Sequence, residues 1–164
     1  MVQFAIRGSG DAVIVLDTNV LSELMSSAPS ETVRSWVLRE HAASPLYTTS
    51  VTAAEILYGV ELLPAGKRKD RLVTEAKAMF AEDFAGRVLS FDLDCARVFS
   101  EIATRRRRSG RPIAEFDAQI AAIAYVHGAV LASRNTADFE GCGVRVVNPW
   151  EEKYLNRPDL PYLK

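Results

Sequence analysis

Short apolar runs alternate with helix-like repeats along most of the chain. Residues 12–16 form a continuous apolar run rich in β-branched side chains, which is typical of a strand buried on both faces. Shorter runs predict four further strands, at residues 46–49, 88–91, 130–133 and 144–147. Between the runs, apolar residues recur at three- and four-residue spacing and predict helices over residues 18–25, 30–43, 52–63, 67–85, 92–108 and 113–126.

Strands that are joined through helices pair in parallel, because each crossover returns the chain to the same edge of the sheet. The alternation therefore predicts an α/β protein, with one three-layer α/β/α domain over residues 12–150. Residues 1–11 lack periodicity and contain Gly-Ser-Gly, so we expect a flexible N-terminal extension there. The polar residues 151–164 are expected to form a C-terminal tail.

The apolar stripes of these helices are expected to face the sheet. In the last helix the inward positions are expected to be Phe116, Ile120, Ile123 and Ala124. Four other side chains fit either the core or an apolar groove for a partner's helix: Trp36, Tyr58, Leu62 and Leu63. We favour the core for these four, because amphipathic helices on a sheet bury such positions.

Composition narrows the class of protein. The chain has 164 residues, enough for one domain with its own core, and a net charge of −1, which argues against nonspecific duplex binding through bulk charge. No apolar run is long enough to span a membrane and no signal peptide is recognisable, so we expect a cytoplasmic protein. Cys95 and Cys142 lie far apart and are expected to be reduced, buried thiols.

Two acidic residues stand at the ends of predicted elements in the first part of the chain. Asp17 directly follows the first strand, and functional groups of a parallel sheet collect at the carboxyl ends of its strands. Asp17 also suits the N-cap of the following helix, and both interpretations stay open. Glu55 lies on a largely apolar helix stripe, where a carboxylate needs a cation or hydrogen bonds. The alternative for Glu55 is a capping box with Thr52.

Two further acidic residues follow in the second part. Asp117 lies in the first turn of an apolar helix, where acids are also favoured by the helix dipole. Asp138 follows the fourth strand in a polar loop, in which it also suits a turn or a cap. Asn135 offers a neutral oxygen in the same loop. Whether Asn135 or Asp138 completes a site stays open.

The four acids together are stronger evidence for a functional site than any one of them alone. Carboxylates that share one cleft repel each other, and a hard divalent cation such as Mg²⁺ or Mn²⁺ relieves that repulsion through oxygen ligation. We therefore hypothesise a metal site built from Asp17, Glu55, Asp117 and Asp138. Zinc is disfavoured, because the two histidines and two cysteines are scattered along the sequence.

Basic residues are concentrated just before the helix of Asp117. Residues 105–108 are four consecutive arginines, and Arg111 follows them. They suit a rim that steers the phosphates of a nucleic acid towards an acidic pocket, but also a solvated helix end that complements the dipole. We favour the solvated end for at least half of them. Arg134 is a second candidate for phosphate contact.

Five motifs, in this order, resemble those of the PIN-domain toxins of bacterial toxin–antitoxin pairs, and the resemblance is strongest to the VapC and FitB-like branch. They are VLDTNVLSE (15–23), TAAEILYG (52–59), FDAQIAA (116–122), RNTADF (134–139) and NPW (148–150). The resemblance covers nearly the whole chain from Val13 to Trp150.

The resemblance implies a parallel sheet of about five strands in the order 3-2-1-4-5 and a metal-dependent endoribonuclease. It places Asp17, Glu55 and Asp117 on the family's acidic positions, and Asp138 or Asn135 on the fourth. It also implies a homodimer and a small antitoxin. That antitoxin binds operator DNA with its N-terminal part and covers the toxin's groove with its C-terminal segment.

Other functions remain as alternatives. A catalytically weak PIN-like binding protein would retain the fold without the activity. A Mg²⁺-dependent phosphotransfer domain also places an Asp after a parallel strand, but Asn19 stands where a phosphatase of the haloacid dehalogenase type needs a second Asp. Dinucleotide binding lacks support, because no GxGxxG motif follows the first strand.

Overall fold

The computed structural model describes residues 13–151, which form a parallel five-stranded sheet covered by helices. The strands are β1 (Ile14–Leu16), β2 (Leu46–Thr49), β3 (Val88–Leu89), β4 (Val130–Ala132) and β5 (Arg145–Val147). Their order is β3-β2-β1-β4-β5 and every neighbouring pair is parallel, as predicted. The predicted extension over residues 1–11 lies outside the described residues, as does the predicted tail apart from Glu151.

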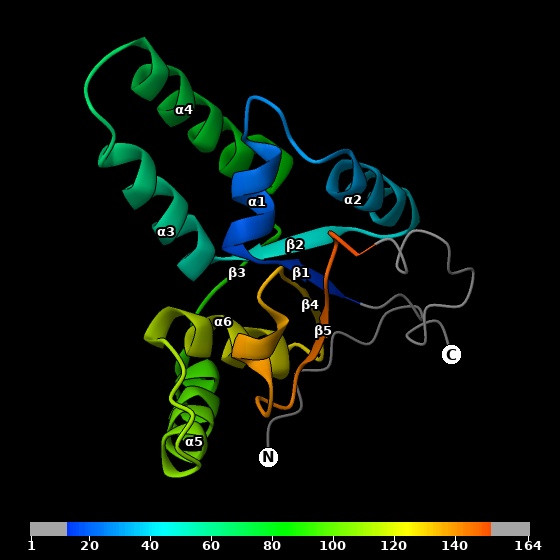
Figure 1. Cartoon of the computed structure of the whole chain (residues 1–164), viewed down its shortest axis with the longest axis vertical. Coiled ribbons are helices and arrows are strands. Elements are labelled where there is room, and N and C mark those ends of the chain that lie inside the picture. Colours follow the sequence, from blue (N-terminus) through cyan, green and yellow to red (C-terminus); the bar gives the residue numbers. More distant parts are fainter. Residues whose placement is uncertain (1–12, 152–164) are drawn as a thin grey trace.

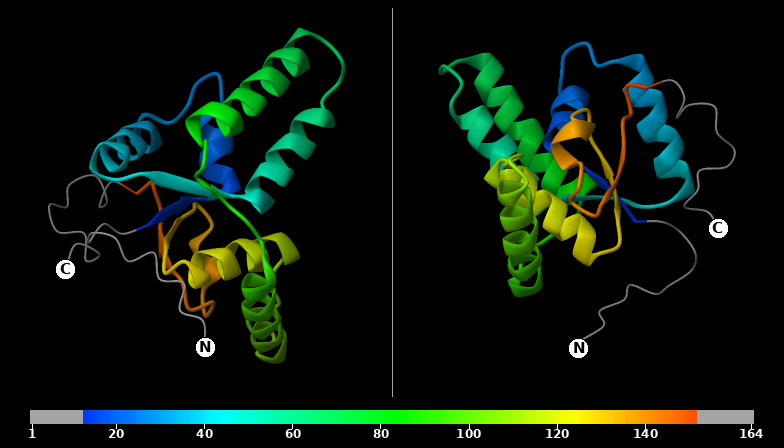
Figure 2. Two further views of the ribbon diagram at one scale, coloured as in Figure 1. Left: turned by 180° about the vertical axis from the view of Figure 1, so that it is seen from behind. Right: turned by 60° about the horizontal axis from the view of Figure 1, so that its bottom comes forward.

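Helices cover both faces of the sheet, which confirms the three layers (Figure 1). They are α1 (Thr18–Leu24), α2 (Glu31–Ala43), α3 (Ser50–Glu61), α4 (Lys67–Ala78), α5 (Leu93–Arg108) and α6 (Glu115–Val126). A π-helix η1 (Met79–Asp83) continues α4, and a 3₁₀-helix η2 (Thr136–Phe139) follows β4. The first four helices lie on one side, whereas α5 and α6 lie on the other (Figures 1 and 2).

The buried strand β1 explains why its sequence is apolar at every position. Ile14 and Leu16 belong to the core between the sheet and α1–α4. Val15 points to the opposite face and packs with α5 and α6. Because side chains alternate along a strand, a strand with a core on both sides has no polar face.

Some predicted details were wrong. The helix predicted over residues 67–85 changes to π geometry after Ala78, and α3 begins at Ser50, two residues before the predicted start. Phe116, predicted to point inward, is 51% exposed. Tyr58 and Leu62, for which the core was favoured, are about two-thirds exposed at 66% and 65%.

Other predictions of burial were correct. Trp36 is fully buried, and Leu63 packs against the same core. Cys95 and Cys142 are free and buried, which confirms that the two cysteines are packed in the core. No helix in the described part of the chain is both long and apolar enough to cross a membrane.

The register of the central strands places two polar residues side by side. Leu16 of β1 pairs with Ala132 of β4, so Asp17 and Ser133 leave the sheet together at its carboxyl edge. The chain winds outwards in both directions from these two strands, because β1 is followed by β2 on one side and β4 by β5 on the other. Crevices at such a switch point are the usual place for a ligand in an open α/β sheet.

Candidate active site

Asp17 is held by three hydrogen-bond donors at the carboxyl end of β1. Its carboxylate accepts from the backbone N–H of Thr18 at 2.7 Å, from Asn19 Nδ2 at 2.8 Å and from Ser133 Oγ at 2.7 Å. Asp17 is 4% exposed, and burial raises the pKa of its carboxyl group although these donors act in the opposite direction. It caps α1 and also lines a cleft, so both interpretations of this residue describe its position.

Glu55 lies on α3 and is linked to the same cleft by Thr18. The N-cap of α3 is Thr49, whose Oγ1 accepts from the backbone N–H of Thr52 at 2.9 Å. The alternative of a capping box between Thr52 and Glu55 is therefore wrong. Instead, the carboxylate of Glu55 accepts a short hydrogen bond from the hydroxyl of Thr18. Glu55 is partly buried and does not point into the core.

Asp117 lies in the first turn of α6 and is partly buried. Within residues 13–151 its side chain accepts no hydrogen bond of ordinary geometry. Burial raises its pKa to about 6, and the negative charges of Asp17, Asp138 and Glu55 add to this effect. Asp117 is therefore a carboxylate without donors among other carboxylates, and a cation would stabilise its charged form.

A cleft of about 440 Å³ brings three of the four predicted acids together. Asp17, Glu55 and Asp117 line it. Asp138 is exposed on η2 at the margin and is not part of the lining, but its charge contributes to the raised pKa of Asp117. Asn135 lines the cleft directly.

The side chains that line the cleft offer ligand atoms that suit a hard cation. Its side chains present carboxylate, amide and hydroxyl oxygens but neither histidine nor cysteine, a set that fits Mg²⁺ or Mn²⁺ and not zinc. In the described part of the chain, no three acidic, histidine or cysteine side chains are arranged to enclose a metal ion. Mg²⁺ does not need such an enclosure, since it retains waters and is commonly held by one or two carboxylates and a substrate phosphate.

Sequence reasoning missed the contribution of three polar residues to the site. Ser133 and Thr18 hold Asp17 and Glu55, and Asn19 donates to both Asp17 and Ser133. Thr18 and Asn19 could have been identified from their place directly after Asp17. Ser133 could be found only with the register between β1 and β4.

The basic run divides into two kinds of residue. Arg105 and Arg106 donate to backbone carbonyls of the loop after η2, and Arg111 pairs with Glu140. All of the five except the buried Arg106 are exposed, which agrees with the solvated helix end favoured for at least half of them. None of the five lines the acidic cleft.

Within residues 13–151, Arg134 is the only basic residue that lines the acidic cleft. Its guanidinium lies over the ring of Trp150, 5.3 Å from the centroid, and its backbone N–H donates to Asn19 Oδ1 at 3.1 Å. Both contacts fix an exposed cation at the edge of a group of carboxylates.

Comparison with known proteins agrees with this arrangement. The PIN domain family model matches residues 14–141. The chain is 39% identical to the VapC ribonuclease Y4jK of Sinorhizobium fredii over 85% of its own length and 99% of that protein. It is 37% identical to the toxin FitB of Neisseria gonorrhoeae, again over 85% of its length and all of the relative. The solved structure of FitAB bound to an IR36 DNA fragment superposes with a TM-score of 0.76 at 36% identity, covering 85% of this chain and 96% of the other.

A parallel sheet of this order with carboxylates at its switch point defines a nuclease-like α/β protein of the PIN class. The chain belongs to the PIN-domain family, and within it to the VapC and FitB ribonuclease toxins of type II toxin–antitoxin systems.

Proposed function

We propose that this protein is a metal-dependent endoribonuclease that hydrolyses RNA phosphodiester bonds in the cleft of Asp17, Glu55 and Asp117. The observation that carries the proposal is the gathering of these carboxylates around one cleft, with Asp117 left without hydrogen-bond donors. Carboxylates that line one cleft repel each other, and a cation bound among them relieves this repulsion.

Asp17 and Asp117 are the residues proposed to hold Mg²⁺ or Mn²⁺. When bound, such an ion lowers the pKa of water and neutralises charge that develops on the phosphate. Asp17 is suited to this because three donors fix its orientation. Glu55 and Asp138 would orient waters or contribute to a second ion.

Thr18 and Ser133 are proposed to set the direction of the acids. Each donates a hydroxyl hydrogen bond to a carboxylate of the cleft, Thr18 to Glu55 and Ser133 to Asp17. A carboxylate that accepts hydrogen bonds on one side presents its remaining lone pairs on the other. The two hydroxyls therefore aim these carboxylates, which side-chain rotation would otherwise leave free.

Arg134 is proposed to bind a phosphate of the RNA. An acidic cleft repels a polyanion, and a cation at its edge offsets this repulsion where the strand enters. The contact with Trp150 orients the guanidinium and leaves it exposed.

A second groove adjoins the acidic cleft and is proposed to bind the antitoxin. This groove of about 550 Å³ shares Thr18 and Glu55 with the cleft and continues over apolar residues, among them Met25, Ile56 and Leu72. A segment lying here would extend over the carboxylates. The structure of FitAB bound to an IR36 DNA fragment supports a partner that contacts DNA, and the proposed DNA is the operator. A homodimer and a cytoplasmic site of action belong to the same proposal.

The alternatives are a catalytically weak PIN-like binding protein and a Mg²⁺-dependent phosphotransfer domain. The test is cleavage of defined RNAs by the wild type and by Asp117→Asn, each with Mg²⁺ and with a chelator. We expect cleavage by the metal-loaded wild type alone. Cleavage that withstands both the chelator and the substitution would contradict the proposal, and a wild type inactive with Mg²⁺ and Mn²⁺ on all RNAs tested would favour the binding protein.

A further inference from the structure

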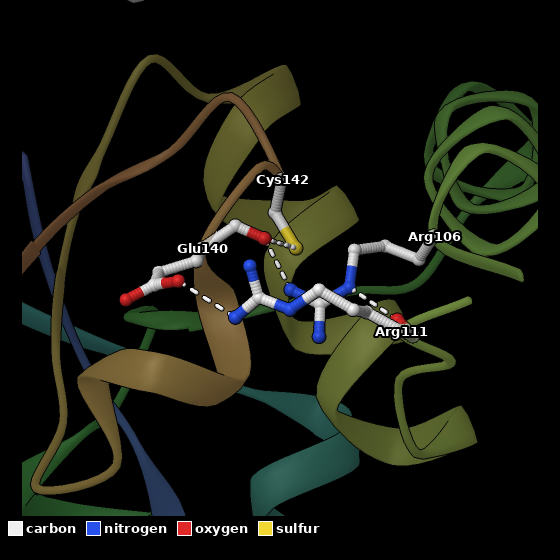
Figure 3. A network of polar contacts seen from close by, with 4 residues as sticks. All are labelled: Arg106, Arg111, Glu140 and Cys142. Atoms are coloured by element: carbon white, nitrogen blue, oxygen red, sulfur yellow. Dashed lines mark hydrogen bonds and ion pairs between the residues drawn. The ribbon is translucent and has the colours of Figure 1, made fainter. Parts of the chain in front are cut away.

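Arg106, in the last turn of α5, is a buried cation that the proposed function does not use. It is 7% exposed, and a guanidinium removed from water is costly unless its donors are satisfied. Its Nε donates to the carbonyl oxygen of Arg111 at 2.7 Å, and its Nη1 donates to the carbonyl oxygen of Glu140 (Figure 3). Within residues 13–151 it forms no ion pair, so backbone carbonyls are its hydrogen-bond acceptors. We call these two bonds the Arg106 clamp.

The two carbonyls belong to the segments that carry two of the proposed site residues. Arg111 lies in the loop that leads into α6, whose first turn holds Asp117. Glu140 directly follows η2, which holds Asp138. The Arg106 clamp therefore ties the loop between α5 and α6 to the residue that follows η2.

Neighbouring contacts reinforce the same tie. Arg105 Nη2 donates to the carbonyl oxygen of Gly141 at 2.8 Å, and Arg111 Nη2 pairs with the carboxylate of Glu140 at 2.7 Å. These two contacts are exposed and water competes with them. Because Arg106 is buried, its hydrogen bonds are screened less by water than the contacts of Arg105 and Arg111. We therefore expect them to contribute most to holding the two segments together.

Each of the two segments carries an acidic residue, Asp117 on α6 and Asp138 on η2, and like charges on neighbouring segments repel each other. The loop after η2 also turns through Gly141 and Gly143, whose φ values of +74° and +76° lie in the left-handed region. Between these glycines, Cys142 is fully buried and belongs to the core on the side of α5 and α6.

We propose that Arg106 is a positioning residue, which holds the end of η2 against the loop that leads into α6 and so keeps Asp117 and Asp138 in place around the cation site. The inference rests on the proposed function. It differs from both interpretations of the basic run, since Arg106 neither faces a phosphate nor lies in solvent. Its exposed neighbours Arg107 and Arg108 are the residues that suit those roles.

The test compares Arg106→Gln with the matched variant Arg107→Gln, which removes the same charge from the same helical turn. Mn²⁺ affinity is measured by titration calorimetry, and kcat and KM on a cleavable RNA, at a temperature at which circular dichroism shows each variant folded. For Arg106→Gln we expect Mn²⁺ affinity to fall about tenfold, the lower end for outer contacts of a metal site, with a matching fall in kcat. KM for RNA should stay within about twofold, because no contact with RNA is lost. Arg107→Gln should bind Mn²⁺ as the wild type does.

Arg106→Lys keeps the charge and the aliphatic stem but cannot present the planar fork that reaches both carbonyls. We expect it to fold and to bind Mn²⁺ more weakly than the wild type, so it carries the test if the glutamine variant does not fold. Wild-type Mn²⁺ affinity in a folded Arg106→Gln or Arg106→Lys variant would overturn the inference. So would a loss confined to KM with a flatter salt dependence, which would make Arg106 an RNA contact. A wild type that neither binds Mn²⁺ nor cleaves RNA would instead overturn the proposed function and this inference with it.

Discussion

Ser133 Oγ donates a 2.7 Å hydrogen bond to Oδ2 of Asp17, joining two residues that lie 116 positions apart in the sequence. Each directly follows a central strand, Asp17 after β1 and Ser133 after β4, and Ser133 is fully buried. The parallel pairing of these strands therefore fixes the position and direction of the acid that we propose as a metal ligand.

Ser133→Ala should weaken both the fold and the site. The substitution removes a donor from a buried carboxylate, so we expect a loss of about 2 kcal/mol in the free energy of unfolding at pH 7. It should also raise the pKa of Asp17 further and reduce cleavage at low pH more than at high pH. Urea unfolding and a pH–rate profile measure these effects. Ser100→Ala, on an exposed serine of α5, is the control, and an equal loss in both variants would contradict the role of Ser133.

Asp117→Asn should stabilise the metal-free protein at high pH while abolishing cleavage. The pKa of Asp117 is about 6 in the folded protein and 3.8 in an unfolded chain. Between these two pH values the folded state therefore binds more protons than the unfolded state. The stability of the wild type is thus lowered fully above pH 6 and regained as the pH falls towards 4. At pH 8 we expect Asp117→Asn to unfold with a free energy higher by about 1–2 kcal/mol, after allowance for solvent screening.

Thermal unfolding in chelator at pH 8 and pH 4.5 measures this difference. It should shrink at the lower pH, where the wild-type carboxyl group is protonated in the folded state. Glu115→Gln, in the same helical turn but exposed, is the matched control and should change little at either pH. A destabilised Asp117→Asn at pH 8 would show that the carboxylate is satisfied by the protein itself.

Arg134→Gln should weaken RNA binding without disturbing the chemistry. Loss of one charged phosphate contact is expected to raise KM about tenfold at low salt, with kcat almost unchanged. The slope of the logarithm of the RNA binding constant against the logarithm of salt concentration should decrease in magnitude by about one, the amount expected for one lost phosphate contact. The same measurements on Arg107→Gln provide the comparison. A fall in kcat at constant KM would place Arg134 in the catalytic step instead.

Gly59→Leu should block the antitoxin while leaving the nuclease intact. Gly59 lines the second groove, and a Cβ added there meets nothing within 4 Å. The helix α3 should gain roughly 0.5–1 kcal/mol from the loss of a glycine. Co-expression with the proposed antitoxin should then no longer relieve growth arrest. The control is Ala54→Leu, exposed on α3 outside the groove lining, and full neutralisation of Gly59→Leu would argue against this groove.

The fold was largely predictable because its central strands β1 and β4 are buried on both faces. The run ending at Leu16 has no polar side, which indicates helices above and below the sheet, and an acid directly after such a strand must lie at its carboxyl edge. The pairing order came only from the family resemblance, since short apolar strands carry no mark of their neighbours.

Exposure at the far ends of helices was not predictable. Tyr58 and Leu62 continue the apolar stripe of α3, but α3 and α4 project away from the sheet in Figure 1, so the end of this stripe has no layer to cover it. Periodicity identifies a stripe and not how far the neighbouring layer extends. The roles of Ser133 and Arg106 were also hidden, because both depend on contacts between residues more than 30 positions apart.

We propose that Asp17 and Asp117 hold a divalent cation between the carboxyl end of β1 and the first turn of α6. Anomalous diffraction from crystals soaked in Mn²⁺ tests it most directly, with Asp117→Asn crystals soaked in parallel. We predict a manganese peak bonded to carboxylate oxygens of both residues in the wild type and its loss in the variant. A wild-type peak elsewhere in the molecule, or a peak in the cleft that persists in Asp117→Asn, would contradict the assignment.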